Sequence, residues 1–237
     1  MKKIIYALFA FVMVMAFTSC QSTKKSAKYQ MKTLKEEKDY TTTTIEYPEF
    51  YDYPEINHAV GTFITSDYDE AKKMFAENNT WWLEEGDLDF IQGIHNEYYV
   101  DCPEIYVNDY VITFIISKYV YLCGAAHGAT TFTSFNYDIA SQSFKDITDI
   151  PWVGDLEKLS AYCTWALKED LYDDGLYEDE WLEQGASATP ENYSAFTYDG
   201  TTLTVYYQQY QVAPYAAGIP CVEFTEKEYR AFFDKQK

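Results

Sequence analysis

The stretch Val111-Ile-Thr-Phe-Ile-Ile-Ser-Lys-Tyr-Val-Tyr121 decides the fold. β-Branched and aromatic residues dominate it, and these residue types are enriched in strands. Apolar residues run through it almost without interruption, as they do in strands that are buried on both faces. We therefore expect a central strand here, and Asn108-Asp109 just before it predicts a hairpin turn.

Shorter strands are expected on both sides of this segment. Asp199-Gly200 predicts a tight turn between two of them. β-Prone residues bounded by turn signals mark residues 40–47, 91–102, 129–138, 196–198, 203–207 and 221–224.

Helical patterns interrupt the strands in an irregular order. Apolar spacing predicts helices over residues 56–65, 67–78 and 155–171, with Ser66 or Asp67 as a cap of the second. Residues 172–194 are acidic and poor in aliphatic side chains, which predicts a variable excursion. Without a regular βα alternation, this order predicts an α+β fold with antiparallel sheets packed against a few helices.

The N-terminus has the three-part layout of a secretory signal. Two lysines precede the apolar run 4–17, which is too short to span a bilayer comfortably. Ser19, a small residue, stands directly before Cys20, which is the pattern that lipoprotein signal peptidase reads. We expect residues 1–19 to be removed and Cys20 to carry a lipid anchor. The alternative is ordinary cleavage nearby and a soluble secreted product.

The segment after the signal sequence differs in composition from the rest. Residues 20–38 are rich in lysine and lack apolar periodicity, which predicts a flexible lipidated tether. Residues 39–237 then form one domain, or two tightly joined subdomains at about 39–105 and 106–237. Because no acidic residue directly follows Cys20, we expect a cell-envelope protein on the outer membrane that faces the periplasm.

The domain is strongly acidic. Residues 39–237 hold 10 basic and 36 acidic residues, which gives a net charge of −26. A field of this sign repels phosphate backbones, which excludes nucleic acid as a partner, and it attracts cationic proteins. Solubility alone also explains an acid excess.

Cysteines bear on the compartment and on the stability of the domain. An even number in an exported domain permits two disulfides, in any of three connectivities. Their spacing fits no CxxC motif, so we expect at least one disulfide and no zinc site. The disulfide candidates are Cys102, Cys123, Cys163 and Cys221.

A segment of small residues, Cys123-Gly-Ala-Ala-His-Gly128, follows the central strand. Gly124 and Gly128 allow close backbone approach or a positive φ, so His127 is presented on a rigid turn. Such a histidine either binds a ligand or donates a proton, or it only bonds a backbone carbonyl.

A second such segment, Gln211-Val-Ala-Pro-Tyr-Ala-Ala-Gly218, follows the strand predicted at 203–207. Pro214 fixes φ and Gly218 permits a turn, which holds Tyr215 in one orientation. The two segments either flank a common site or only pack against each other.

Aromatic residues are unusually frequent, with 24 Tyr and 5 Trp. Aromatic faces suit carbohydrate stacking and protein interfaces. We expect most of these rings to be structural, with Trp81, Trp82 and Tyr215 as exceptions.

The sequence contains none of the common catalytic motifs. There is no GxSxG elbow, HExxH pair, phosphate loop or dinucleotide fingerprint. His58, His95 and His127 share no metal-ligand spacing, and residues 170–183 imitate a calcium loop only in part. We therefore expect no cofactor and no metal site, and weak calcium binding by the acidic segment is left open.

Several motifs together resemble a known family. They are Tyr47-Pro48, Ile56-Asn57, Gly124 to Gly128, Phe135-Asn136-Tyr137-Asp138 and Tyr210 to Gly218. Over residues 41–232 the chain resembles the extracytoplasmic domain of unknown function that the anti-sigma factor RsiV shares with the peptidoglycan deacetylase PdaC. The resemblance implies an α+β module without catalytic residues of its own. In the anti-sigma factor this module binds lysozyme, and in the deacetylase it accompanies a separate catalytic domain.

Composition, motifs and resemblance together predict a non-catalytic, lipid-anchored envelope module. Its expected ligand is a protein or a cell-wall component, such as a lysozyme-like cationic protein or a peptidoglycan fragment. The alternatives are a peptidoglycan-acting enzyme or accessory, with His127 and a carboxylate as acid and base, and a purely structural envelope lipoprotein. The ligand-binding candidates are His127, Gly124, Gly128, Pro214, Tyr215, Gly218, Tyr210, Trp81 and Trp82.

Overall fold

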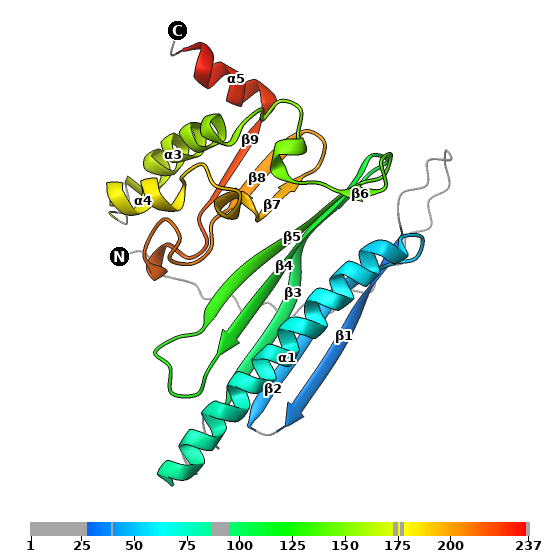
Figure 1. The fold of residues 1–237 in the computed structure, drawn as a ribbon, viewed down its shortest axis with the longest axis vertical. Helices are drawn as coiled ribbons and strands as arrows, with labels where there is room; N and C mark the ends of the chain where they lie inside the picture. The colour runs from blue at the N-terminus through cyan, green and yellow to red at the C-terminus, as the bar shows by residue number, and fades with distance from the viewer. Residues whose placement is uncertain (1–27, 39, 87–94, 173–174, 176–177, 236–237) are drawn as a thin grey trace, which may run out of the picture.

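The central strand predicted from the sequence lies inside a six-stranded sheet (Figure 1). The structure, a computed structural model, describes residues 28–38, 40–86, 95–172, 175 and 178–235. The strands of this large sheet lie in the order β1 (Tyr29–Lys38), β2 (Thr41–Phe50), β3 (Asn96–Val107), β4 (Val111–Tyr121), β5 (Ala129–Asp138) and β6 (Ser143–Phe144). β2 and β3 pair in parallel, and all other neighbours pair antiparallel. The α+β fold class is confirmed, with a mixed sheet where a purely antiparallel one was expected.

One long helix, α1 (Pro54–Glu85), covers one face of the large sheet (Figure 1). It connects β2 to β3 and allows them to run parallel, because parallel neighbours need a long crossover. The sequence predicts two helices here with a break at Asp67, and that prediction is wrong. The Asp67 carboxylate does not cap a second helix, because it accepts hydrogen bonds from Tyr98 Oη at 2.7 Å and Lys118 Nζ at 2.6 Å.

The first core lies between α1 and the large sheet. Burial of each aliphatic or aromatic side chain contributes about 1.5–3 kcal/mol, so this layer fixes the helix on the sheet. Its buried members include Ile45, Ile56, Val60, Ile64, Ala71, Phe75, Tyr98, Val100, Ile112, Phe114 and Ile116.

A second body follows, built on a three-stranded antiparallel sheet with β8 in the middle. Its regular elements are α3 (Leu156–Tyr172), α4 (Asp179–Gly185), β7 (Phe196–Tyr198), β8 (Thr202–Tyr206), β9 (Cys221–Thr225) and α5 (Glu226–Asp234). Its connections hold the short 3-10 helices η1 (Ile147–Asp149), η2 (Glu191–Tyr193) and η3 (Tyr215–Ala217). Its core combines aliphatic side chains with a group of aromatic rings, among them Tyr162, Tyr193, Tyr207, Phe224 and Tyr229.

The second body packs against the face of the large sheet opposite α1. Successive side chains of a strand point to opposite faces. Phe114 and Ile116 of β4 therefore belong to the first core, whereas Ile115 between them packs against Ala195 and Tyr206. The middle of β4 is buried on both faces, as its continuous apolar pattern predicts.

Two predicted boundaries change in the structure. The tether predicted for residues 20–38 ends earlier, because residues 29–38 form β1, which pairs with β2 along its whole length. Every β1 side chain is exposed, so backbone hydrogen bonding holds this strand and apolar periodicity gives no signal for it. The two cores divide between Ile139 and Ile147, whereas the division predicted near residue 105 falls inside β3.

The expected signal sequence at 1–19 and lipid site at Cys20 lie outside the described residues. Among the helices of the described ranges, none is both long enough and apolar enough to cross a membrane.

The four cysteines of the domain are free thiols, which corrects the prediction of a disulfide. Cys163 of α3 is completely buried in the aromatic core of the second body, and this burial raises its pKa to about 12. Cys123 is buried at the end of β4, in the other body, while Cys102 lies on β3 and Cys221 on β9. The even number of cysteines therefore does not indicate pairing. The four side chains lie in different places in the fold, which their spacing in the sequence does not reveal.

Candidate functional site

The loop that follows β4 is fixed on the C-terminal end of α1. Its first residue, Cys123, donates its backbone N–H to Asn96 Oδ1 at 2.8 Å and accepts at its carbonyl from Trp82 Nε1 at 3.0 Å. The next residue, Gly124, has φ +88°, and a Cβ there would lie 2.3 Å from Trp82 Cζ2. Only glycine satisfies both the left-handed conformation and this close approach.

The far end of the same loop is fixed on the large sheet. A Cβ on Gly128 would lie 2.3 Å from Cε2 and Cζ of Tyr119, so the Tyr119 ring packs directly on the Gly128 backbone. His127 Nδ1 lies 2.9 Å from the Gly128 carbonyl oxygen, which orients the imidazole. The His127 side chain is thereby presented at the surface on a short, rigid turn.

The loop between β8 and β9 is held by Gln211. Its amide oxygen accepts the backbone N–H of Gln208 at 2.9 Å, and its amide nitrogen donates to the Gly185 carbonyl at 2.9 Å. A Cβ on Gly185 would lie 1.8 Å from Gln211 O, so α4 packs directly against this loop. Trp181 Nε1 also donates to Tyr210 O at 2.8 Å.

Two glutamine side chains join this loop to the edge of β5. Gln208 accepts the Phe132 N–H and donates to the Phe132 carbonyl, both at 2.8 Å, as a neighbouring strand would. Gln209 accepts the Thr130 N–H at 2.8 Å. The free edge of β5 is therefore covered, and the second body is held in register with the large sheet.

Three rings from the two loops form a surface group that we call the ring cluster: exposed His127 and Tyr210, and half-buried Tyr215. His127 stacks on Tyr215 with centroids 4.0 Å apart and planes at 26°. Tyr210 Oη lies 3.0 Å from His127 Nε2, and the Tyr210 side chain is 47% exposed. Tyr210 has φ +65°, which is strained for a residue with a side chain. Strained backbone conformations cluster at functional sites, so the strain at Tyr210, whose ring is exposed, favours a binding role.

The remaining candidates from the sequence support the cluster or stand apart from it. Pro214 caps η3 with φ −65°, and Gly218 ends it with φ +68°, so both fix the position of Tyr215 between them. Trp82 acts through Gly124, as described above. Trp81 is 53% exposed and contacts Trp82 edge-on at 4.5 Å, without an observed contact to the ring cluster.

The sequence reasoning missed the residues that hold the cluster together. Gln208, Gln209 and Gln211 carry the loop, and Tyr119 carries Gly128. The run Gln208-Gln-Tyr-Gln211 was the available signal, since amide side chains bond backbone groups readily.

The chemistry of the cluster favours binding. His127 contacts a backbone carbonyl, a phenol hydroxyl and a phenol ring, and among the described residues no carboxylate contacts it. An acid–base pair would need a partner to orient and charge the imidazole. In the part of the chain that the structure describes, no three His, Cys, Asp or Glu side chains are placed to hold a metal ion.

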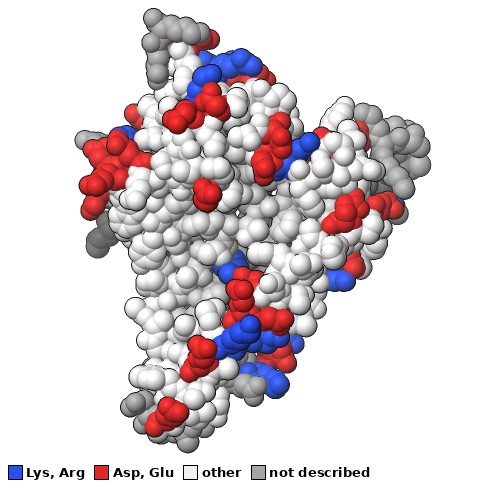
Figure 2. Space-filling model, viewed as in Figure 1, with Lys and Arg blue, Asp and Glu red and all other residues white. Residues whose placement is uncertain are grey.

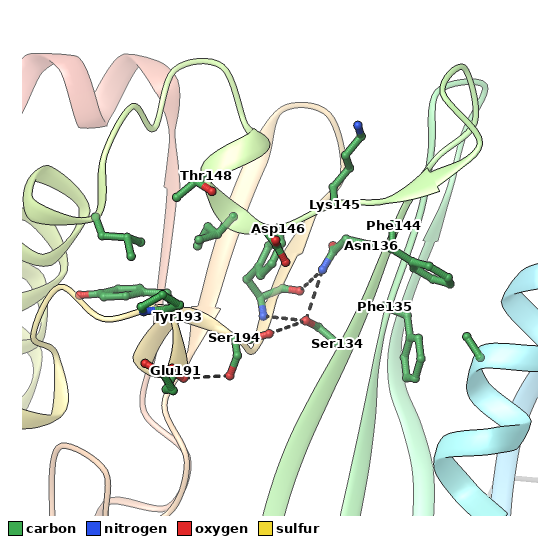
Figure 3. A pocket seen from close by; sticks show the side chains of 15 residues that line it. Ser134, Phe135, Asn136, Phe144, Lys145, Asp146, Thr148, Glu191, Tyr193 and Ser194 are labelled. Atoms are coloured by element: carbon green, nitrogen blue, oxygen red, sulfur yellow. Dashed lines mark hydrogen bonds between the residues drawn. The ribbon is translucent and has the colours of Figure 1, made fainter.

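A cleft of about 610 Å³ lies between the two bodies, where β5 faces β7 and η2 (Figure 3). Its polar groups bind one another. Asn136 Nδ2 donates to Phe196 O at 2.9 Å, and Ser134 Oγ donates to Ser194 O at 3.0 Å while it accepts the Phe196 N–H at 3.1 Å (Figure 3). These satisfied groups join the bodies, and the ring cluster is the better candidate for a ligand site.

Two family models match the chain, one over most of the first body and one over most of the second. Residues 34–130 match the family model described as Deacetylase PdaC, and residues 146–226 match the model described as Protein of unknown function (DUF3298). The chain thus carries a PdaC-type segment followed by a DUF3298 segment, and the resemblance drawn from its motifs is confirmed. His127 lies in the first segment, and Tyr210 and Tyr215 lie in the second.

Among individual proteins, the chain is similar to the peptidoglycan-N-acetylmuramic acid deacetylase PdaC of Bacillus subtilis (strain 168). The two are 31% identical over 164 residues, which cover 66% of this chain and 34% of the relative. The chain therefore spans about one third of the length of that relative.

Two solved structures of DUF3298 family proteins share the fold. One from Pseudomonas aeruginosa PAO1 has a TM-score of 0.55 at 16% identity, covering 85% of this chain and 90% of that chain. One from Bacteroides fragilis NCTC 9343 has a TM-score of 0.52 at 16% identity, covering 86% of this chain and 92% of that chain.

Proposed function

We propose that this chain is a non-catalytic binding module of the cell envelope and that the ring cluster contacts its protein or cell-wall ligand. The stack of His127 on Tyr215 carries the proposal, because it is built from both bodies and lies at the surface. Rigidly held aromatic rings make good anchors, since they bury a large area at a small cost in conformational entropy. The hydrogen bonds of Gln208, Gln209 and Gln211 fix the loop that carries Tyr210 and Tyr215, so little conformational entropy remains to be lost on binding.

The acidic domain suits a cationic protein ligand such as a lysozyme-like protein. At −26, the field of residues 39–237 raises the rate of association with a cation and makes binding depend on salt. A peptidoglycan fragment is the other expected ligand of an envelope module. By the same proposal, lipid at Cys20 tethers the module to the outer membrane on its periplasmic side.

The lipid anchor is tested separately from the ligand. Cys20→Ser is expected to abolish incorporation of labelled fatty acid and to release the protein from the membrane fraction. Continued labelling of the variant would contradict lipidation at this residue.

The binding function is tested by capture from envelope extract and from solutions of purified lysozymes and sacculi, at low and high salt. The full chain is compared with Tyr215→Ala and with Tyr110→Ala, a control at a tyrosine that is 68% exposed on the β3–β4 turn. We expect saturable capture by the full chain and the control and loss of capture by Tyr215→Ala. A lower melting temperature for Tyr215→Ala with unchanged capture would instead support a purely structural protein.

A second candidate function is action on peptidoglycan, which is favoured because the similar Bacillus subtilis protein is a peptidoglycan-N-acetylmuramic acid deacetylase. It predicts that the protein changes muropeptide profiles and that His127→Ala stops the change without unfolding the domain. Unchanged profiles from the full chain would exclude this function.

A further inference from the structure

We propose that the ring cluster is one end of a row of aromatic rings that binds a neutral, N-acetylated glycan strand. This inference rests on the proposed binding function and names its ligand class. The row, which we call the aromatic row, consists of Tyr99, Tyr119, His127, Tyr215 and Tyr210.

The first two rings lie on the large sheet. Tyr99 of β3 and Tyr119 of β4 are directly opposite in register, and their rings stack with centroids 6.0 Å apart and planes at 18°. They share the face opposite α1, because Tyr98 and Val100 on either side of Tyr99 belong to the first core. The second body covers the middle of β4 at Ile115 and leaves this end of the face partly open.

The sheet rings connect to the ring cluster through the loop after β4. The Tyr119 ring packs on Gly128, the neighbour of His127, and His127 stacks on Tyr215. Rings from three separate segments therefore follow one another along one surface. A ligand that inserts one side chain would contact one ring, whereas a row of rings suits an extended polymer.

The charge around the row indicates a neutral ligand. Residues 119–137 and 200–222 contain no Lys, Arg, Asp or Glu, although the domain as a whole has a net charge of −26. In the space-filling view, the surface below the acidic group on the side where α4 lies is largely free of charged side chains (Figure 2). Burial first, and the Glu97 carboxylate second, raise the pKa of the Tyr99 and Tyr119 phenols, so these phenols stay uncharged.

A glycan matches this chemistry better than a charged polymer. A pyranose ring offers an apolar C–H face to an aromatic ring, while its hydroxyls can bond the phenol and imidazole groups of the row. An anionic polymer would be repelled by the acidic field of the domain, whereas a neutral glycan is not. Exposed alanines at positions 125, 126 and 216 provide small apolar surfaces for N-acetyl methyl groups.

The test is calorimetric titration of the full chain with the hexamer of N-acetylglucosamine, with cellohexaose as the comparison without acetyl groups. Loss of one stacking ring is expected to weaken binding about three- to tenfold. We expect this loss for Tyr99→Leu and for Tyr215→Ala, no change for Tyr110→Ala, weaker binding of cellohexaose, and affinities that do not depend on salt.

Tyr99 separates this inference from the proposed function, because it lies away from both loops. Equal binding of the hexamer by Tyr99→Leu and the full chain, or no binding by the full chain, overturns the glycan row. If the full chain then still captures a protein through Tyr215, the binding function stands and only the ligand class is wrong. If it captures nothing, both fail. Circular dichroism spectra and melting temperatures establish that each variant is folded.

Discussion

Among the exposed glycines that the structure describes, Gly124 is the one where replacement by alanine should lower the free energy of unfolding most. Gly124 has φ +88°, and an added Cβ would lie 2.3 Å from Trp82 Cζ2. Gly154 offers a matched control, because its φ is +80° and a Cβ there would meet nothing within 4 Å. The two substitutions share the cost of the left-handed backbone and differ only in the contact with Trp82.

The magnitude follows from these contacts. A left-handed alanine costs about 1–2 kcal/mol, and the stiffer unfolded chain offsets about 0.4–1 kcal/mol of it. Gly154→Ala should therefore cost about 0.5–1 kcal/mol. At Gly124 the Trp82 ring must also move, which loses its hydrogen bond to Cys123 O, about 1 kcal/mol, and about 1–2 kcal/mol of packing. We expect a total of about 3 kcal/mol for Gly124→Ala.

Urea unfolding followed by circular dichroism measures both variants. In a Trp82→Leu background the added methyl group meets a smaller side chain, so Gly124→Ala should there cost no more than Gly154→Ala. The resulting coupling energy between positions 82 and 124 should be about 2–2.5 kcal/mol. Equal destabilisation by Gly124→Ala and Gly154→Ala, or a coupling near zero, would refute the role of Trp82 in fixing this loop.

Three further predictions concern the thiols, α5 and the joint between the bodies. Native protein should react with a thiol reagent first at exposed Cys221, and at Cys163 only on unfolding, because burial raises the Cys163 pKa to about 12; equal rates would contradict this. Hydrogen bonds from Thr225 lower the Glu228 pKa below its ordinary 4.5, so its stabilising effect is present above that pH and is lost as pH falls through the lowered value. Glu228→Gln should flatten the dependence of the melting temperature on pH at and below pH 4.5, whereas an unchanged profile would contradict the capping role. Gln208→Ala should cost about 1–3 kcal/mol in urea unfolding, because it leaves the backbone groups of β5 unpaired, and a neutral effect would contradict that pairing.

The sequence predicted those elements whose formation depends mainly on neighbouring residues. The apolar run of β4, the helix α3 and the turn at Asp199-Gly200 all occur where the sequence indicates them. The break predicted inside α1 failed, because the carboxylate of Asp67 bonds to β3 and β4 instead of to its own backbone. β1 was not predicted because backbone hydrogen bonds to β2 hold it, and its exposed side chains show no apolar periodicity.

The candidate site was predictable only in its parts. Small residues and glycines marked both loops, and Tyr215 and His127 stood out as the polar rings within them. That the rings stack depends on how the second body sits on β5, which Gln208 and Gln209 determine through contacts far apart in the sequence. Tyr99 and Tyr119 gave no signal either, since strand register, and not sequence spacing, places them side by side.

The division of the ring cluster between two bodies links affinity to mechanics. A ligand that touches both His127 and Tyr215 binds only while the joint is closed, so its binding energy adds to the energy that keeps the joint closed. By reciprocity, a force that opens the joint expels the ligand, and an occupied site resists the same force. A change in tension across the molecule and a change in ligand concentration therefore act on one equilibrium.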